Sequence, residues 1–192
     1  SASIRTRIAI LKKAEELFMV GKLVDFADEA SLGIAGLSDK CEGMVGWNFF
    51  GRTSRDKIFS DQFKKRKSFR KGIYRALENI PLTGEVTKEM FDNYVNDFLK
   101  ITKIQNSRTI ITRFLAMKRP DVFVCLSSKN EEVLEFLGLE QKTVSIQKYW
   151  EKVCSRAQKT LWYNTPIQEI KAEETDIFKY KMAMLDALCY KR

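Results

Sequence analysis

The sequence predicts an all-α fold, a single helical domain of about seven to nine helices spanning residues 1–192. Apolar residues recur at steps of three and four along most of the chain. The 192 residues include only 9 Gly and 3 Pro, too few for a β-sandwich with many tight turns. Hydrophobic residues make up 44% of the chain, enough for a substantial core. A two-lobed arrangement of 1–87 and 88–192 also fits, as does one short β-hairpin near 31–60.

The first helix is expected over residues 3–20, because apolar side chains face one side of it. Gly21 ends this helix, and a second, short helix is expected over 22–30. Residues 31–56 then form the longest irregular segment, since five of the nine glycines fall there. Loops of this length often carry function.

A strongly basic helix is expected over residues 61–80. It has an apolar stripe at helical spacing, and no acidic residue lies between Asp61 and Glu78. A helix with these charges favours an anionic partner over internal pairing. The seven cations are Lys64, Lys65, Arg66, Lys67, Arg70, Lys71 and Arg75.

The second half of the chain alternates further helices with short turns. Thr87 is a predicted N-cap, Asn130 is another, and Gly138 is a predicted helix stop. Pro120 ends a helix, and a short apolar, strand-like run follows at 122–126. The helices are expected over 88–100, 107–117, 131–137, 145–159 and about 174–190.

Composition excludes several kinds of chemistry. The chain contains no His, which removes Ser-His-Asp and Cys-His catalysis and histidine-based zinc sites. The four Cys are widely spaced without a CxxC pair, so we expect no metal, no cofactor and reduced core thiols. No apolar run reaches membrane-spanning length and no signal peptide is visible, so we expect a cytoplasmic protein without a membrane partner.

The net charge of +9 favours a polyanion, above all nucleic acid, over a simple solubility surplus. Cations of the basic helix would contact DNA phosphates without reading the sequence. A second phosphate site is expected at the start of helix 107–117, where backbone N–H groups and the helix dipole favour anions. Its residues are Asn106, Ser107 and Arg108.

The order of elements from 88 to 139 resembles the core of the helix-hairpin-helix DNA glycosylase superfamily, which includes 8-oxoguanine and endonuclease III-like enzymes. A helix leads into the hairpin "KIQNSRT" at 103–109, then a helix, a buried turn and a helix ending in "FLGL". The family's hairpin lysine corresponds to Arg108, and its catalytic Asp corresponds to Ser127, 19 residues later. Ile104 and Asn106 replace the hairpin glycines, so the resemblance is to an atypical member.

The resemblance implies that the turn 121–130 points reactive groups at a flipped nucleotide. Lys129 is the candidate amine, able to attack the sugar and form a Schiff base. Asp121 and Asp186 are the candidate carboxylates, and Ser127 stands where the family has its Asp. Asp186 interrupts the apolar run "MAMLDALCY", and its alternative role is to pair with an internal Arg. For Asp121 the alternative is an ordinary polar turn residue.

Two aromatic clusters are candidates for a base pocket, because rings beside an Asn supply stacking together with a hydrogen bond to a base edge. The first is Trp47, Asn48 and Phe49, inside the glycine-rich segment. The second is "LWYNTP", with Trp162 and Asn164. The alternative for each ring is that it anchors a loop on the core.

The sequence therefore predicts a DNA glycosylase that flips and excises a damaged or modified base, including a hypermodified phage base, from double-stranded DNA. One alternative is a non-catalytic DNA-binding subunit of a bacterial repair or anti-phage defence complex, which Ser127 favours. Another is a protein-interaction domain whose basic helix binds an acidic partner. The oligomeric state is left open, with a monomer favoured.

Overall fold

The computed structural model describes residues 2–20, 28–104, 108–128, 132–140 and 144–189. These residues form an all-α domain with one two-stranded antiparallel hairpin, which confirms the predicted fold class. The hairpin strands are β1 (Lys40–Cys41) and β2 (Met44–Val45), within the segment where a hairpin was expected. In the described part of the chain, no helix is long and apolar enough to cross a membrane.

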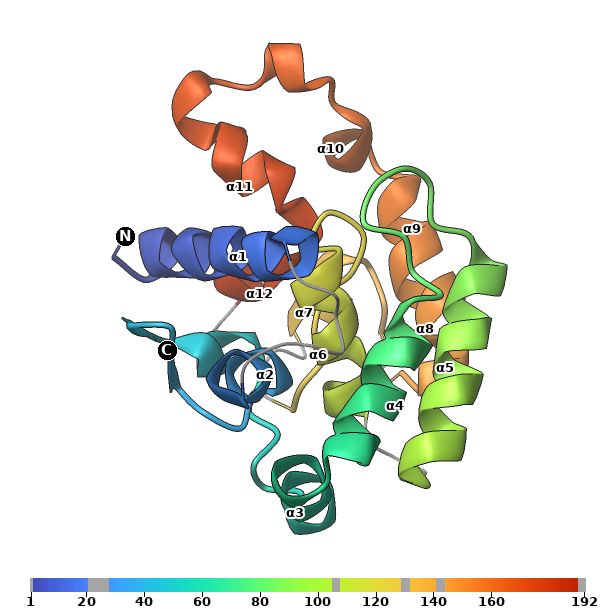
Figure 1. Ribbon diagram of the computed structural model, residues 1–192. Helices are drawn as coiled ribbons and strands as arrows, with labels where there is room; N and C mark the ends of the chain where they lie inside the picture. Colours follow the sequence, from blue (N-terminus) through green and yellow to red (C-terminus); the bar gives the residue numbers. More distant parts are fainter. Residues whose placement is uncertain (1, 21–27, 105–107, 129–131, 141–143, 190–192) are drawn as a thin grey trace.

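Helix α6 (Arg108–Lys118) lies at the centre of the fold (Figure 1). Its residues from Ile110 to Lys118 are all buried, and it packs against α1 (Ala2–Val20), α2 (Asp28–Ala35) and α12 (Lys181–Cys189). The first and last helices therefore meet on the same central helix, and α1 also contacts α12.

The basic segment is not the single helix expected over 61–80. It divides into α3 (Lys57–Lys65) and α4 (Lys67–Leu77), because Arg66 takes an extended conformation (φ −119°, ψ 103°). Arg70 stabilises this break by donating to the carbonyl oxygens of Phe63 and Lys64 at the end of α3. The break lets both helices turn their aromatic rings towards the core. There the centroid of the Phe59 ring lies 5.4 Å from that of Phe63 and 6.1 Å from that of Phe69.

Helix α5 (Lys88–Thr102) runs beside α4 (Figure 1). Its predicted N-cap is confirmed, since the Thr87 hydroxyl accepts a hydrogen bond from the Met90 N–H. The helix ends at Lys103, whose φ of 55° is left-handed. Asn106 and Ser107 of the expected hairpin lie outside the described residues.

After α6 the chain forms a buried loop, 119–128, and then α7 (Glu132–Phe136). The expected strand-like run in this loop pairs with no strand among the described residues. Gly138 ends α7 as predicted: its φ is 68°, and the Leu139 N–H donates to the Leu134 carbonyl. Lys129 and Asn130 lie outside the described residues.

The helix expected over 145–159 is confirmed as α8 (Ile146–Tyr149), a π-helical turn η3 (Trp150–Cys154) and α9 (Ser155–Gln158). The helix expected over 174–190 breaks at Tyr180, between α11 (Thr175–Lys179) and α12. The Tyr180 hydroxyl donates to the Glu15 carboxylate on α1 over 2.7 Å, so a tertiary contact stabilises the break.

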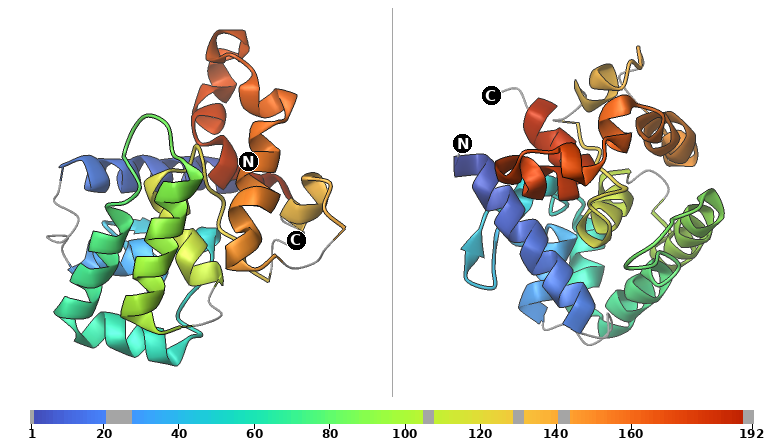
Figure 2. Two further views of the ribbon diagram at one scale, coloured as in Figure 1. Left: turned by 90° about the vertical axis from the view of Figure 1, so that its right-hand side faces the viewer. Right: turned by 90° about the horizontal axis from the view of Figure 1, so that it is seen from above.

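Between these two regions the chain forms an arm that projects from the body of the domain in the views of Figures 1 and 2. It consists of short helical turns joined by extended residues. These turns are α10 (Leu161–Asn164), η4 (Ile167–Glu169), η5 (Ala172–Glu174) and α11. Ion pairs tie its end to α1, from Lys12 to Asp176 and from Lys179 to Glu15.

Candidate functional site

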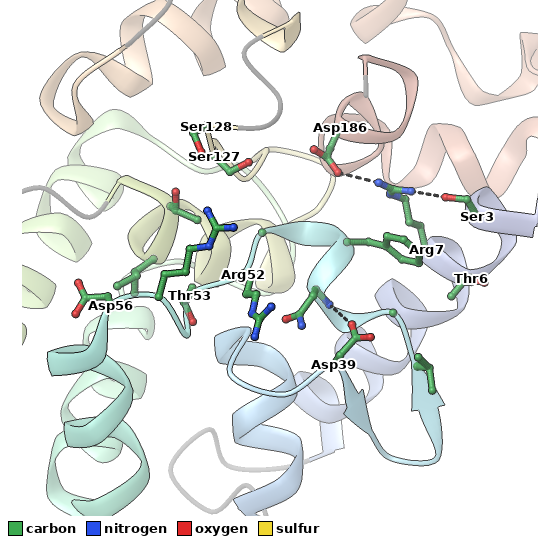
Figure 3. A pocket seen from close by; sticks show the side chains of 18 residues that line it. Ser3, Thr6, Arg7, Asp39, Arg52, Thr53, Asp56, Ser127, Ser128 and Asp186 are labelled. Atoms are coloured by element: carbon green, nitrogen blue, oxygen red, sulfur yellow. Dashed lines mark hydrogen bonds and ion pairs between the residues drawn. The ribbon is translucent and has the colours of Figure 1, made fainter. Parts of the chain in front are cut away.

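A pocket of about 960 Å³ opens between elements that are far apart in the sequence (Figure 3). Its walls come from the start of α1, the segment from Val45 to Asp56, the start of α6, the tip of the 119–128 loop, and Asp186 on α12. The segment includes the 3₁₀ turn η2 (Trp47–Phe50). Of the predicted residues, the structure brings Asn48, Phe49, Ser127 and Asp186 together at this pocket.

Buried side chains hold the loop that carries Ser127 and Ser128. The Tyr149 hydroxyl donates to the Val124 carbonyl over 2.7 Å and accepts from the Val124 N–H over 3.0 Å. Thr112 accepts from the Leu126 N–H, and Thr109 donates to the Leu126 carbonyl. The loop thus satisfies its buried backbone groups without a strand partner, and its tip reaches the pocket.

Arg113 holds the segment on the other side. Its side chain is fully buried and donates to four carbonyl oxygens over 2.6–2.9 Å. Burial lowers the pKa of the Arg113 guanidinium to about 10, so the group remains charged at neutral pH. One side chain therefore connects the end of α2 with both ends of η2. The four acceptors belong to Gly33, Ile34, Trp47 and Gly51.

The two loops touch at Gly51. Its φ of 92° is left-handed, and a Cβ atom added there would lie 2.7 Å from the Cys125 sulfur. Gly46 has a similar function at the other end of η2, where φ is 109° and an added Cβ would lie 2.7 Å from the Phe49 ring. Part of the glycine content of 31–56 therefore serves close packing around the pocket.

Asp186 forms a buried ion pair with Arg7 over 3.1 Å, as Figure 3 shows. The Arg7 guanidinium also donates to the Ser3 hydroxyl over 2.5 Å and lies 4.5 Å from the centre of the Phe49 ring. The alternative role considered for Asp186, pairing with an internal arginine, is therefore confirmed. The pair joins the first and last helices at the pocket wall.

Two further carboxylates line the pocket, and each has a structural partner. An oxygen of Asp39 accepts from the Asn48 N–H over 2.9 Å (Figure 3). An oxygen of Asp56 accepts from the Phe59 N–H over 2.9 Å and so caps α3. Arg52 and Arg55, which are both exposed, add positive charge to the same wall.

Three predicted pocket residues lie elsewhere. Trp47 is fully buried and donates from Nε1 to the Cys41 carbonyl, so it anchors η2 on the core. Trp162 contacts the Phe136 ring, 5.9 Å away between centroids. Asn164 donates from its side-chain amide to the Gln158 and Thr160 carbonyls. These three side chains therefore lie outside the pocket that Asn48 and Phe49 line, and Trp47 takes the alternative role of anchoring its loop on the core.

Asp121 lies outside this pocket as well. It forms a two-pronged ion pair with Arg119, over 2.9 and 2.7 Å, and lines a second depression of about 570 Å³ that also includes Asn164. Arg119 in turn donates to the carbonyls of Pro81 and Gly84. The geometry thus does not bring Asp121 to Ser127 and Asp186.

The predicted DNA-contacting cations are largely exposed. Arg70 is one of two exceptions, because it is half-buried and bonds to the end of α3. Arg108 is also half-buried and donates to the Val144 carbonyl over 3.4 Å. The exposed cations lie along α3 and α4, and α3 begins at the pocket residue Asp56. They are Lys64, Lys65, Lys67, Lys71 and Arg75.

Sequence reasoning missed the arginines of this site. Arg113 had a usable signal, since it interrupts the apolar run of α6 as Asp186 interrupts that of α12. Arg7, Arg52 and Arg55 had none, because a lone arginine on a helix or in a loop is ordinarily solvated. In the described ranges, no group of three or more His, Cys, Asp or Glu could hold a metal ion.

We compared the chain with known protein families, curated proteins and solved structures. No known protein family matches the chain, and no match was found among curated proteins or solved structures.

Proposed function

We propose that this protein binds double-stranded DNA and accepts a flipped-out nucleotide in the pocket beside Asn48 and Ser127. The observation that carries the proposal is the convergence of two loops on one pocket. The loop of Asn48 and Phe49 meets the tip of the loop that presents Ser127 and Ser128. A base taken out of the stack needs such a pocket, with an aromatic ring and polar groups for its edge.

The size and lining of the pocket suit a nucleotide. Its volume of about 960 Å³ is at the upper end of ligand pockets in proteins. Phe49 is 39% exposed, so its ring is available to a ligand although Arg7 lies against it. Asn48, Ser127 and Ser128 add polar groups to the same lining. Arg52 and Arg55 at the exposed wall would contact the phosphates of that nucleotide.

The surface charge extends from the pocket along a path that DNA phosphates would follow. Helix α3 starts at the pocket, and its nine residues span about 13 Å and end with the exposed Lys64 and Lys65. Lys67, Lys71 and Arg75 continue the basic surface on α4. Contacts of this kind supply affinity and orientation without sequence reading.

Base excision is the second candidate function, and Asp186 is the observation that favours it. The side chain is buried and forms an ion pair with Arg7 over 3.1 Å. A carboxylate at a pocket wall is suited to stabilise positive charge on a sugar during cleavage of its bond to the base. Arg7 opposes this effect, and Ser127 stands where the resembling enzymes have an Asp. Binding with a flipped nucleotide is therefore our primary proposal.

Flipping is tested with duplexes that carry 2-aminopurine, whose fluorescence rises when it leaves the stack. We expect the wild-type protein to raise the fluorescence and the variant R52E/R55E to weaken binding and lose the signal. The variant K148E/K159E, with the same change in net charge on exposed residues far along the chain, is the control. Unchanged fluorescence with saturating wild-type protein would contradict the proposal.

Excision is tested separately, by counting abasic sites in duplexes with oxidised, deaminated, alkylated or hypermodified bases. If excision occurs, D186N should slow it while DNA binding persists. If the 2-aminopurine fluorescence rises but no duplex gains abasic sites, the protein flips nucleotides and has no glycosylase activity on these bases. Base release that D186N does not slow would contradict the role of Asp186.

A further inference from the structure

Most polar side chains around the pocket are already engaged in the fold. The Thr53 hydroxyl donates to the Ala35 carbonyl over 2.5 Å, and the Thr109 hydroxyl donates to the Leu126 carbonyl over 3.0 Å. Asp39 and Asp56 accept backbone N–H groups, and Asp186 is paired with Arg7. These side chains position the walls of the pocket.

Asn48 is different. Its Oδ1 atom is buried and has no hydrogen-bond partner among the described residues, although the residue lines the pocket. A buried acceptor without a donor is unfavourable, and native structures rarely keep one without a functional reason. The unused acceptor indicates a ligand that brings a donor.

The position of Asn48 is rigidly determined. Its backbone N–H is held by Asp39, and the carbonyl of the preceding Trp47 accepts from Arg113 over 2.9 Å. Trp47 itself is buried, and its indole N–H is bonded to the Cys41 carbonyl. These contacts fix the backbone from which the Asn48 side chain extends, so its amide can reorient towards a ligand only by rotation about its own side-chain torsions.

We infer that Asn48 selects the flipped base by accepting a hydrogen bond from an amino group on its edge. The inference rests on the proposed flipping and adds the chemical class of the base. Adenine and cytosine carry such amino donors, at N6 and N4. Their counterparts without the amino group, purine and 2-pyrimidinone, leave Oδ1 unpaired in the occupied pocket. The adjacent Phe49 ring contributes stacking, which does not distinguish between them.

The experiment compares two pairs of duplexes, each with the test nucleotide opposite an abasic site so that no pairing partner differs. Adenine is compared with purine, and cytosine with 2-pyrimidinone, by competition against a labelled 2-aminopurine duplex. We expect the wild-type protein to prefer the amino base in at least one pair by about tenfold or more. N48L should abolish the preference, because leucine is similar in size and accepts no hydrogen bond.

Two further variants complete the test. N48D retains an acceptor oxygen at this position and should keep the preference, while N96L, at an exposed position on α5, should behave as wild type. Equal affinity of the wild-type protein within both pairs, or a preference for the base without the amino group, would overturn the inference while flipping itself stands. Absence of flipping in every duplex would overturn the proposed function as well.

Discussion

A guanidinium nitrogen of Arg113 donates to the carbonyl oxygen of Gly51 over 2.6 Å, and this bond joins the central helix to a pocket-lining loop. Three further bonds from the same side chain orient η2 and the end of α2. The pocket therefore depends on a residue that does not line it. Arg113 determines where Asn48 lies, and the contact of Gly51 with Cys125 determines how closely the second loop approaches.

Replacing Arg113 by Met should destabilise the protein by at least about 3 kcal/mol, because buried carbonyl oxygens lose their donors. Arg113→Lys should recover part of this loss, since one ammonium reaches fewer of the four acceptors than a guanidinium. Urea unfolding measures both. Arg75→Met, at an exposed position on α4, is the control and should change stability by less than about 0.5 kcal/mol. A similar, small effect at both positions would show that the loops hold without this side chain.

Gly51→Ala should lower the free energy of unfolding more than Gly84→Ala. Both residues have left-handed φ values, 92° and 80°, so both substitutions strain the backbone by about 1–2 kcal/mol. Only at Gly51 does the new methyl group meet a neighbour, the Cys125 sulfur. The loss of stability at Gly51 beyond that at Gly84 should become smaller when Cys125→Ala is introduced as well. Thermal unfolding of the single and double variants checks this, and equal losses at the two glycines would refute the close contact.

Asp186→Ala should destabilise the fold by about 3–5 kcal/mol, since Arg7 is left charged and buried without its partner. The double variant Arg7→Met with Asp186→Leu should lose less than the two single variants together, because no charge remains buried. A double-mutant cycle in urea measures the coupling. Additive effects would mean that the pair contributes only as two separate side chains.

Lys118 should make stability depend on pH between about 8 and 10.5, the pKa values of its ammonium in the folded and the unfolded chain. Burial lowers the pKa of its ammonium from 10.5 to about 8, so the unfolded chain binds this proton more readily than the folded one. The lysine contribution to stability is therefore least favourable below pH 8 and improves by about 1 kcal/mol from pH 8 to 9. The difference in unfolding free energy between wild type and Lys118→Met isolates it from other titrating groups. Lys100→Met, at an exposed position, should show no such trend.

DNA affinity should depend on salt through the exposed cations of α3 and α4. Reversing Lys64, Lys67 and Lys71 to Glu should weaken binding to all sequences and reduce the slope of log affinity against log salt. Reversal of three exposed lysines elsewhere, Lys148, Lys159 and Lys171, changes the net charge equally and should retain most of the slope. If both triple variants lose the slope alike, the effect reports net charge and the DNA lies on another face.

Local patterns predicted many of the elements. Thr87 is an N-cap and Gly138 a helix stop, because capping depends on residues within one turn. The breaks at Arg66 and Tyr180 were missed because helical periodicity continues through both. Contacts from elsewhere in the fold stabilise them, from Arg70 to the end of α3 and from Tyr180 to Glu15. Short-range patterns carry no record of such contacts.

The sequence by itself determined the all-α class, the exclusion of histidine chemistry and the surplus of positive charge, since these follow from composition and spacing alone. Only the tertiary structure decided which polar residues meet. Asp186 pairs with Arg7 across 179 positions, and Asn48 shares a pocket with Ser127 while Trp47 and Asp121 turn to other partners. Such pairings depend on how helices pack, and packing is determined by the sum of many weak contacts along the whole chain.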